Sequence, residues 1–146
     1  MAGESMKFKF KLESVLNYRM DIEKEQYANY LKEDQHLTLL QERMNELNKE
    51  MTEIDVRLKE KGISSSYYCS CVQYKEFLKQ KETELLKKIY EQSQITLQKK
   101  DEWVEARKEV LILEKLKEKQ AAEFKQKMED SEQQELDELA TLRFNR

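Results

Sequence analysis

The sequence of 146 residues contains no proline and only two glycines, Gly3 and Gly62. Proline removes a main-chain hydrogen bond from a helix and glycine weakens a helix interior, so their scarcity leaves very long helices uninterrupted. Gly62 is the only glycine between the long stretches that are rich in Glu, Lys, Leu and Gln. The chain is therefore predicted to bend once, near Gly62.

Histidine and cysteine are also scarce, with His36, Cys69 and Cys71 as their only representatives. A tetrahedral zinc site needs four ligands, and His36 would lie ~39 Å from the cysteines along a helix. We expect His36 to face solvent and the two thiols to be reduced. The sequence has no glycine-rich phosphate loop either. No catalytic, metal-binding or cofactor-binding residue is predicted, and the chain is not expected to be an enzyme.

Two further absences limit the possible partners. The net charge of −3 argues against nucleic acid, because phosphate binding needs a concentrated basic surface. The longest uncharged run, from Ile63 to Tyr74, is too short and too polar to span a membrane. The start lacks the apolar core of a secretory signal. We therefore expect a cytoplasmic protein.

Apolar residues are nevertheless abundant, and they form a seam along the first half of the chain. A spacing of alternating threes and fours keeps one stripe facing a partner helix in a coiled coil. Continued backwards, the same register meets polar residues between Arg19 and Glu33, where we expect looser or shifted packing. The regular part of the seam is Leu37, Leu40, Met44, Leu47, Met51, Ile54 and Leu58.

The bend itself carries helix stop and start signals. Gly62 can adopt the left-handed conformation beyond a helix end, and Ile63 then falls where a Schellman motif would fold it onto Leu58. Ser70, followed three residues later by Gln73, has the pattern of a capping box that begins a second helix. The sequence predicts helix one over about 8–61, a turn over about 62–70 and helix two over about 71–142.

The second helix continues the apolar seam with polar interruptions, and a short turn makes the two helices antiparallel. The predicted fold is all-α, one domain over residues 1–146, with two long helices in an antiparallel coiled-coil hairpin and the second helix longer. The seam residues of helix two are Leu78, Leu85, Ile89, Trp103, Ala106, Val110 and Leu113.

Two surface features leave alternatives open. Large apolar residues gather at and after the turn, and they either close the end of the hairpin or face a protein partner. They are Tyr67, Tyr68, Tyr74, Phe77 and Leu78. Lysines open the chain at positions 7, 9 and 11, while acidic residues crowd positions 129–138. These charges either form solvated faces, or bring the two ends together or onto a charged partner.

Both ends also carry specific patterns. Met6 to Leu16 reads MKFKFKLESVL and leads to Arg19 and Glu23, which resembles the F-x-F-x-L-x-x-V-L opening of the flagellar FliJ family. The LEKL segment at 113–116 and the EQ…LDELA…R pattern at 132–143 resemble the far end of that family. The YKEFL segment at 74–78 resembles the aromatic stretch after the family's turn.

The resemblance implies a soluble stalk-like component of the bacterial flagellar type III protein export apparatus, without a cofactor. It implies binding to the hexameric export ATPase and to the cytoplasmic domain of the export gate, and escort of export chaperones by some members. Membrane association would occur through protein partners only, at the cytoplasmic face of the inner membrane. Carried over by motif, the ATPase-binding candidates are Arg19, Leu136, Asp137, Glu138 and Arg143. The gate-binding candidates are Tyr74, Phe77 and Leu78.

A second class of function also fits the residues. A homo-oligomeric coiled coil that acts as a scaffold or spacer, with no ATPase partner, would show the same seam. The polar positions at Arg19, Gln26 and Glu33 are compatible with it, because a dimer tolerates weak stretches as well as a hairpin does.

Overall fold

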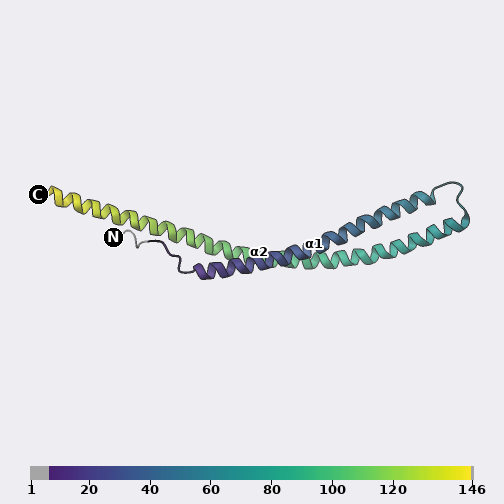
Figure 1. The fold of residues 1–146 in the computed structure, drawn as a ribbon, viewed down its shortest axis with the longest axis horizontal. Helices are drawn as coiled ribbons and strands as arrows, with labels where there is room; N and C mark the ends of the chain where they lie inside the picture. Colours follow the sequence, from purple (N-terminus) through teal and green to yellow (C-terminus); the bar gives the residue numbers. More distant parts are fainter. Residues whose placement is uncertain (1–6, 146) are drawn as a thin grey trace. The chain divides into compact units, whose positions relative to one another are not determined.

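The computed structural model describes residues 7–145 and contains two helices joined by a short loop (Figure 1). Helix α1 spans Glu13–Leu58 and has 46 residues. Helix α2 spans Ser65–Phe144 and has 80 residues. The predicted all-α fold of two helices, with the second longer, is confirmed.

Contacts between the helices fall into two units, which we describe separately. The terminal unit comprises Met1–Lys24 with Val104–Arg146, and the loop unit comprises Glu25–Trp103. In each unit, residues farther along α1 meet residues earlier in α2, so the paired segments are antiparallel. The cross-helix ion pairs are Glu13–Lys117, Arg19–Glu109 and Glu23–Arg107 in the terminal unit, and Asp55–Lys75 in the loop unit, where His36 also contacts Gln92. Whether the chain forms one domain stays a prediction.

The first helix begins five residues later than predicted, because residues 7–12 pack in a different way. Phe10 is buried and Phe8 packs against the same apolar cluster. Residues two apart lie on opposite sides of a helix but on the same side of an extended segment. Burial of both rings therefore favours a non-helical opening, and the Glu13 N–H donates to the Phe10 carbonyl at 3.2 Å.

The predicted Schellman motif at Gly62 is wrong, although Gly62 does adopt a left-handed φ of 85°. Helix α1 ends at Leu58, the last apolar residue of the seam, three residues before the predicted end at about 61. The N–H groups of Lys59 and Glu60 donate to carbonyls three residues back, and this satisfies part of the helix end. Gly62 turns the loop and does not cap the helix.

The second helix begins at Ser65, six residues before the predicted start. Ser64 is the N-cap, because its Oγ accepts a hydrogen bond from the Tyr67 N–H at 3.2 Å. Ser70 lies inside the helix and its hydroxyl donates to the Ser66 carbonyl at 3.1 Å. Cys71, where the helix was predicted to start, is a buried residue of the seam inside α2.

The predicted seam residues form the core of each unit. In the terminal unit, Leu16 and Val110 are buried together with Phe10. In the loop unit, Leu78 is buried between Leu47 and Ile54. Partly buried residues extend both clusters: Met20, Leu113 and Leu116 in the terminal unit, and Met44, Met51, Leu58 and Leu85 in the loop unit.

We expected looser or shifted packing between Arg19 and Glu33, but the part of this stretch that lies in the loop unit is packed against α2. Trp103 fills the seam there, with its ring stacked on Tyr30 at 5.9 Å between centroids and tilted against Tyr27 at 5.0 Å. One layer farther on, Gln92 and Thr96 are buried and hydrogen-bonded to Glu33. The register is therefore kept, because aromatic and polar groups fill the layers that lack aliphatic residues.

Candidate partner-binding surfaces

The loop unit carries exposed aromatic side chains at the start of α2. Tyr67, Tyr74 and Phe77 are spaced by seven and three residues, which places them on one side of the helix. All three are between 42% and 49% exposed, and Tyr68, about a quarter turn away, is 47% exposed. The aromatic cluster therefore faces solvent and does not close the end of the hairpin. We call Tyr67, Tyr68, Tyr74 and Phe77 the aromatic surface.

Polar neighbours hold the aromatic surface in place. The Tyr74 hydroxyl donates to a Glu50 carboxylate oxygen at 3.3 Å. The negative charge of Glu50 raises the pKa of Tyr74 above its ordinary value, so the phenol stays a hydrogen-bond donor. The Tyr74 and Phe77 ring centroids are 6.2 Å apart, and the Lys81 ammonium lies 4.6 Å from the Phe77 centroid. The rings are thus presented in a defined arrangement.

Leu78, the third gate-binding candidate, lies in the core. It is 1% exposed and packs between Leu47 and Ile54. A side chain that is fully covered within the chain has no surface to offer a partner. Leu78 therefore positions the helix that carries Tyr74 and Phe77.

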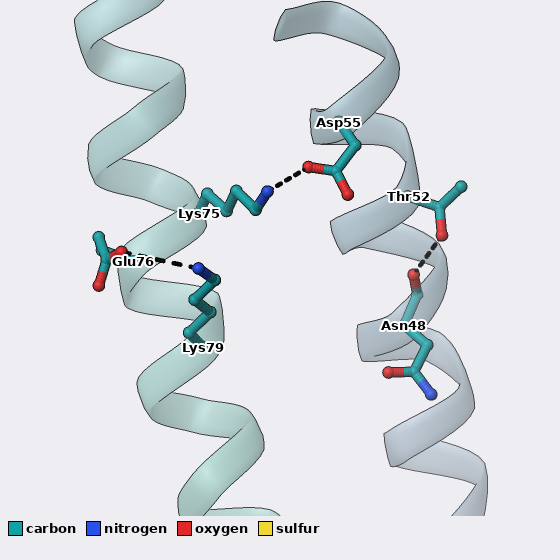
Figure 2. A network of polar contacts seen from close by, with 6 residues as sticks. All are labelled: Asn48, Thr52, Asp55, Lys75, Glu76 and Lys79. Carbon is teal, nitrogen blue, oxygen red and sulfur yellow. Dashed lines mark hydrogen bonds and ion pairs between the residues drawn. The ribbon is translucent and has the colours of Figure 1, made fainter.

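A cross-helix ion pair lies beside this region (Figure 2). The Lys75 ammonium is 2.5 Å from a carboxylate oxygen of Asp55 and lowers the pKa of Asp55 below its ordinary value of 3.8. Figure 2 also shows the weaker Lys79–Glu76 contact within α2, at 3.9 Å. Lys75 and Asp55 therefore link α1 to α2 one residue after Tyr74.

A second candidate surface lies at the end of α2, in the terminal unit. Every described residue from 129 onward is exposed. Leucines are among them, with Leu136 at 60%, Leu139 at 57% and Leu142 at 65% exposed. One side of this helical segment forms what we call the C-terminal surface: Leu136, Leu139, Ala140, Arg143 and Phe144.

The five ATPase-binding candidates do not form one cluster. Leu136 and Arg143 share the C-terminal surface, and Asp137 and Glu138 lie next to it on the same turns. Asp137 accepts hydrogen bonds within α2 from Gln133 and Thr141. Arg19 instead pairs with Glu109 at 2.6 Å, ~40 Å by helical rise from Leu136. Arg19 therefore links α1 to α2 within the terminal unit.

Sequence reasoning missed two features. Lys7, Lys9 and Lys11 line a surface depression around Phe8, together with α2 residues that include Phe124. The alternation of lysine and phenylalanine was the signal for that arrangement. His36 is exposed, as expected, but its Nδ1 lies 2.9 Å from the side-chain carbonyl of Gln92. This contact could not be predicted, because it depends on which residues of the two helices face each other.

The described residues give no candidate for catalytic chemistry. Cys69 is exposed and Cys71 is buried, and both are free thiols. Residues 7–145 contain no group of three or more His, Cys, Asp or Glu side chains placed to hold a metal ion. Over the same range, neither helix includes a stretch apolar and long enough to cross a membrane.

The fold and its exposed surfaces define an all-α two-helix protein whose accessible features suit contacts with other proteins. The family described as the flagellar FliJ protein matches residues 8–146, which is nearly the whole chain. The chain therefore belongs to the FliJ family, a non-catalytic family of the flagellar export apparatus. Comparisons with curated proteins and with solved structures find no match.

Proposed function

We propose that this member of the FliJ family binds the hexameric export ATPase through the end of α2 and the cytoplasmic domain of the export gate through the aromatic surface. The observation that carries the proposal is the C-terminal surface, where leucines are exposed along a helix that no other part of the described chain covers. Exposed apolar residues on one helical face are typical of protein contacts.

The geometry refines the candidate residues of each contact. Leu136 and Arg143, with Asp137 and Glu138 beside them, would meet the ATPase, whereas Arg19 would act indirectly by holding α1 on α2. Tyr74 and Phe77 would meet the gate, and Leu78 would hold their helix in position. The protein would then work in the cytoplasm, at the inner membrane face, and reach the membrane only through these partners.

An asymmetric helix pair in a ring of identical subunits meets each subunit differently. Such a ligand favours one nucleotide state of a subunit over another only when its contact energy differs between those states. The protein would in this way affect ATP turnover without being an enzyme itself. Escort of export chaperones by exposed apolar residues is a further part of the proposal.

Titration of the purified protein against the cognate ATPase tests the first contact. We expect the wild-type protein to change hexamer formation and turnover, and the Leu136→Ala/Leu139→Ala variant to lose most of this effect. Leu97→Ala is the matched control, because Leu97 is an equally exposed leucine of the loop unit. A wild-type protein that changed neither quantity would rule out the ATPase contact.

A pull-down with the cytoplasmic domain of the export gate tests the second contact. Tyr74→Ala/Phe77→Ala should reduce capture at unchanged helicity. Tyr90→Ala is the control, since Tyr90 is 66% exposed on α2 outside the aromatic surface. Equal loss of capture in both variants would argue against a gate contact at Tyr74 and Phe77.

A further inference from the structure

Helix α2 carries two adjacent blocks of opposite charge in the terminal unit. Residues 115–127 include five lysines and two glutamates, and residues 129–138 include six acidic residues and no basic one. Lys117 pairs with Glu13, but among residues 7–145 no acidic side chain of the second block forms an ion pair. The acidic block is therefore free of charge partners within the described chain.

The basic block is reinforced by the opening segment of the chain. Lys7, Lys9 and Lys11 lie with Lys127 around one depression on the surface of α2, and Glu123 is the one acidic residue that lines it. None of these four lysines takes part in an ion pair of the described residues. A concentrated positive surface thus lies directly before a concentrated negative one.

The two blocks cannot neutralise each other within one molecule. Lys127 and Glu129 belong to the same uninterrupted helix, so the acidic block cannot fold back onto the basic one. An exposed block of one charge is either solvated or paired with a second molecule. A helix with a positive block followed by a negative block is complementary to itself when two copies run antiparallel, whereas a parallel pair would put like charges together.

We propose that two copies of this chain associate through an antiparallel α2–α2 contact with its two-fold axis near Met128. Each acidic block then lies along the lysines of the other copy, and both contacts form at once because the symmetry is isologous.

The same register also pairs exposed apolar residues. Phe144 lies sixteen residues after Met128, and Ile112 lies sixteen residues before it. The two side chains are 90% and 65% exposed in the single chain, so their mutual burial removes apolar surface from water. Asp137 lies seven residues before Phe144, on the same side of the helix, and is level with Lys119 of the other copy. Charge and apolar exposure therefore indicate one register.

The dimer has a consequence for the ATPase contact, and this consequence rests on the proposed function. Asp137 and Phe144 lie on the contact face of the dimer, so a dimeric protein cannot present them to the ATPase. The dimer would thus be an inactive form of the protein, and it would dissociate into monomers on dilution or on ATPase binding. The dimer itself does not depend on the ATPase, so its test can succeed or fail separately.

Sedimentation equilibrium of the full chain over a concentration series at low and high salt is the first measurement. We expect a monomer–dimer equilibrium whose dissociation constant rises at least tenfold at high salt, because salt screens exposed charges. A monomer at every concentration in low salt overturns the proposal. A dimer that is indifferent to salt overturns it as well, since the contact would then not be electrostatic.

Two charge-reversed variants test the pairing directly. One carries Glu132→Lys, Glu135→Lys and Asp137→Lys, and the other carries Lys9→Glu, Lys119→Glu and Lys127→Glu. Each alone should dimerise at least tenfold more weakly than the wild-type protein, and an equal mixture should recover dimers because complementary charges then face each other. Recovery in the mixture also proves that both variants fold. Failure of the mixture to associate contradicts the charge pairing.

One added cysteine in a Cys69→Ser background, where Cys71 is buried, tests the register. The two copies of Glu129→Cys would lie within ~3 Å of each other along the axis, whereas the two copies of Gln133→Cys would lie ~15 Å apart. A short bis-maleimide cross-linker should join the first variant and not the second. Equal cross-linking of both variants would show a different contact and overturn the register.

The control for the charge-reversed variants is Lys87→Glu/Lys100→Glu, which reverses two charges in the loop unit. This variant should dimerise like the wild-type protein.

Discussion

Gln92 of α2 donates from its side-chain amide to the main-chain carbonyl of Glu33 on α1, at 3.1 Å. The same amide nitrogen lies 2.6 Å from the Glu33 carboxylate, and the Thr96 hydroxyl also donates to the Glu33 carbonyl. Gln92 and Thr96 are only 6% and 7% exposed. A buried polar layer with its partners in place fixes which residues face each other across the seam.

The first prediction concerns this polar layer. Gln92→Ala should lower the free energy of unfolding by about 1–3 kcal/mol, because buried polar groups of Glu33 lose their partner. Glu33→Leu/Gln92→Leu should recover most of this loss, because replacing both partners by apolar side chains of similar volume leaves neither side chain buried without a hydrogen bond. Urea unfolding followed by circular dichroism measures both. A double variant less stable than Gln92→Ala would contradict this account.

The second prediction compares Leu78 with Phe77, because Leu78 is buried and the neighbouring Phe77 is exposed. Leu78→Ala should cost about 2–5 kcal/mol of unfolding free energy, as expected for a buried leucine between Leu47 and Ile54. Phe77→Ala should change stability little, because its ring is half exposed. Thermal unfolding of the two variants measures the difference. Similar losses of stability in both variants would contradict the prediction.

The third prediction uses the ion pair between Asp55 and Lys75. The pKa of Asp55 lies below 3.8 because the Lys75 ammonium is hydrogen-bonded to the carboxylate. Since the folded pKa is depressed, the pair stabilises the fold above the unfolded pKa, and this contribution disappears as the pH falls through the folded pKa. Carboxyl titration by NMR should show the pKa of Asp55 rising toward 3.8 in Lys75→Met.

The control for this titration is Lys87→Met, which removes an exposed lysine that does not contact Asp55. It should leave the pKa of Asp55 where it is in the wild-type protein. An Asp55 titration that Lys75→Met left unchanged would mean that the ion pair does not form in solution.

The fourth prediction concerns the opening segment. Phe10 is 7% exposed and packs with Leu16 and Val110. Phe10→Ala should loosen this segment and the first turn of α1, with faster amide hydrogen exchange over residues 13–16. Lys9→Ala, in the same segment but exposed, should leave the exchange rates unchanged. Unchanged exchange in both variants would show that Phe10 does not anchor the segment.

The seam was predictable from sequence because a heptad pattern depends only on the spacing of apolar residues along one helix. Leu47, Ile54 and Leu78 were assigned to it and are buried. The helix boundaries were less predictable, because three serines at 64–66 and a fourth at 70 can all cap a helix. The Ser64 Oγ accepts a hydrogen bond from the Tyr67 N–H and so identifies Ser64 as the cap, whereas the Ser70 hydroxyl donates to a helix carbonyl.

The candidate surfaces divide in the same way. Exposure of Tyr67 and Tyr68 could be expected, since two helices cannot bury so many large rings near a loop. The separation of Arg19 from Leu136 could not be expected, because a motif match does not reveal the ion pair between Arg19 and Glu109. The burial of Leu78 had a signal in its seam register, and the family resemblance outweighed that signal.

Trp103 is the only tryptophan of the chain, and its indole ring packs on Tyr27 and Tyr30 of the opposite helix. Its fluorescence is consequently an intrinsic optical reporter of whether α1 and α2 are paired at that level. Energy transfer from the two tyrosines is efficient only while the helices are together. The emission of one residue can thus follow separation of the helix pair in real time, during unfolding or partner binding, without any added label.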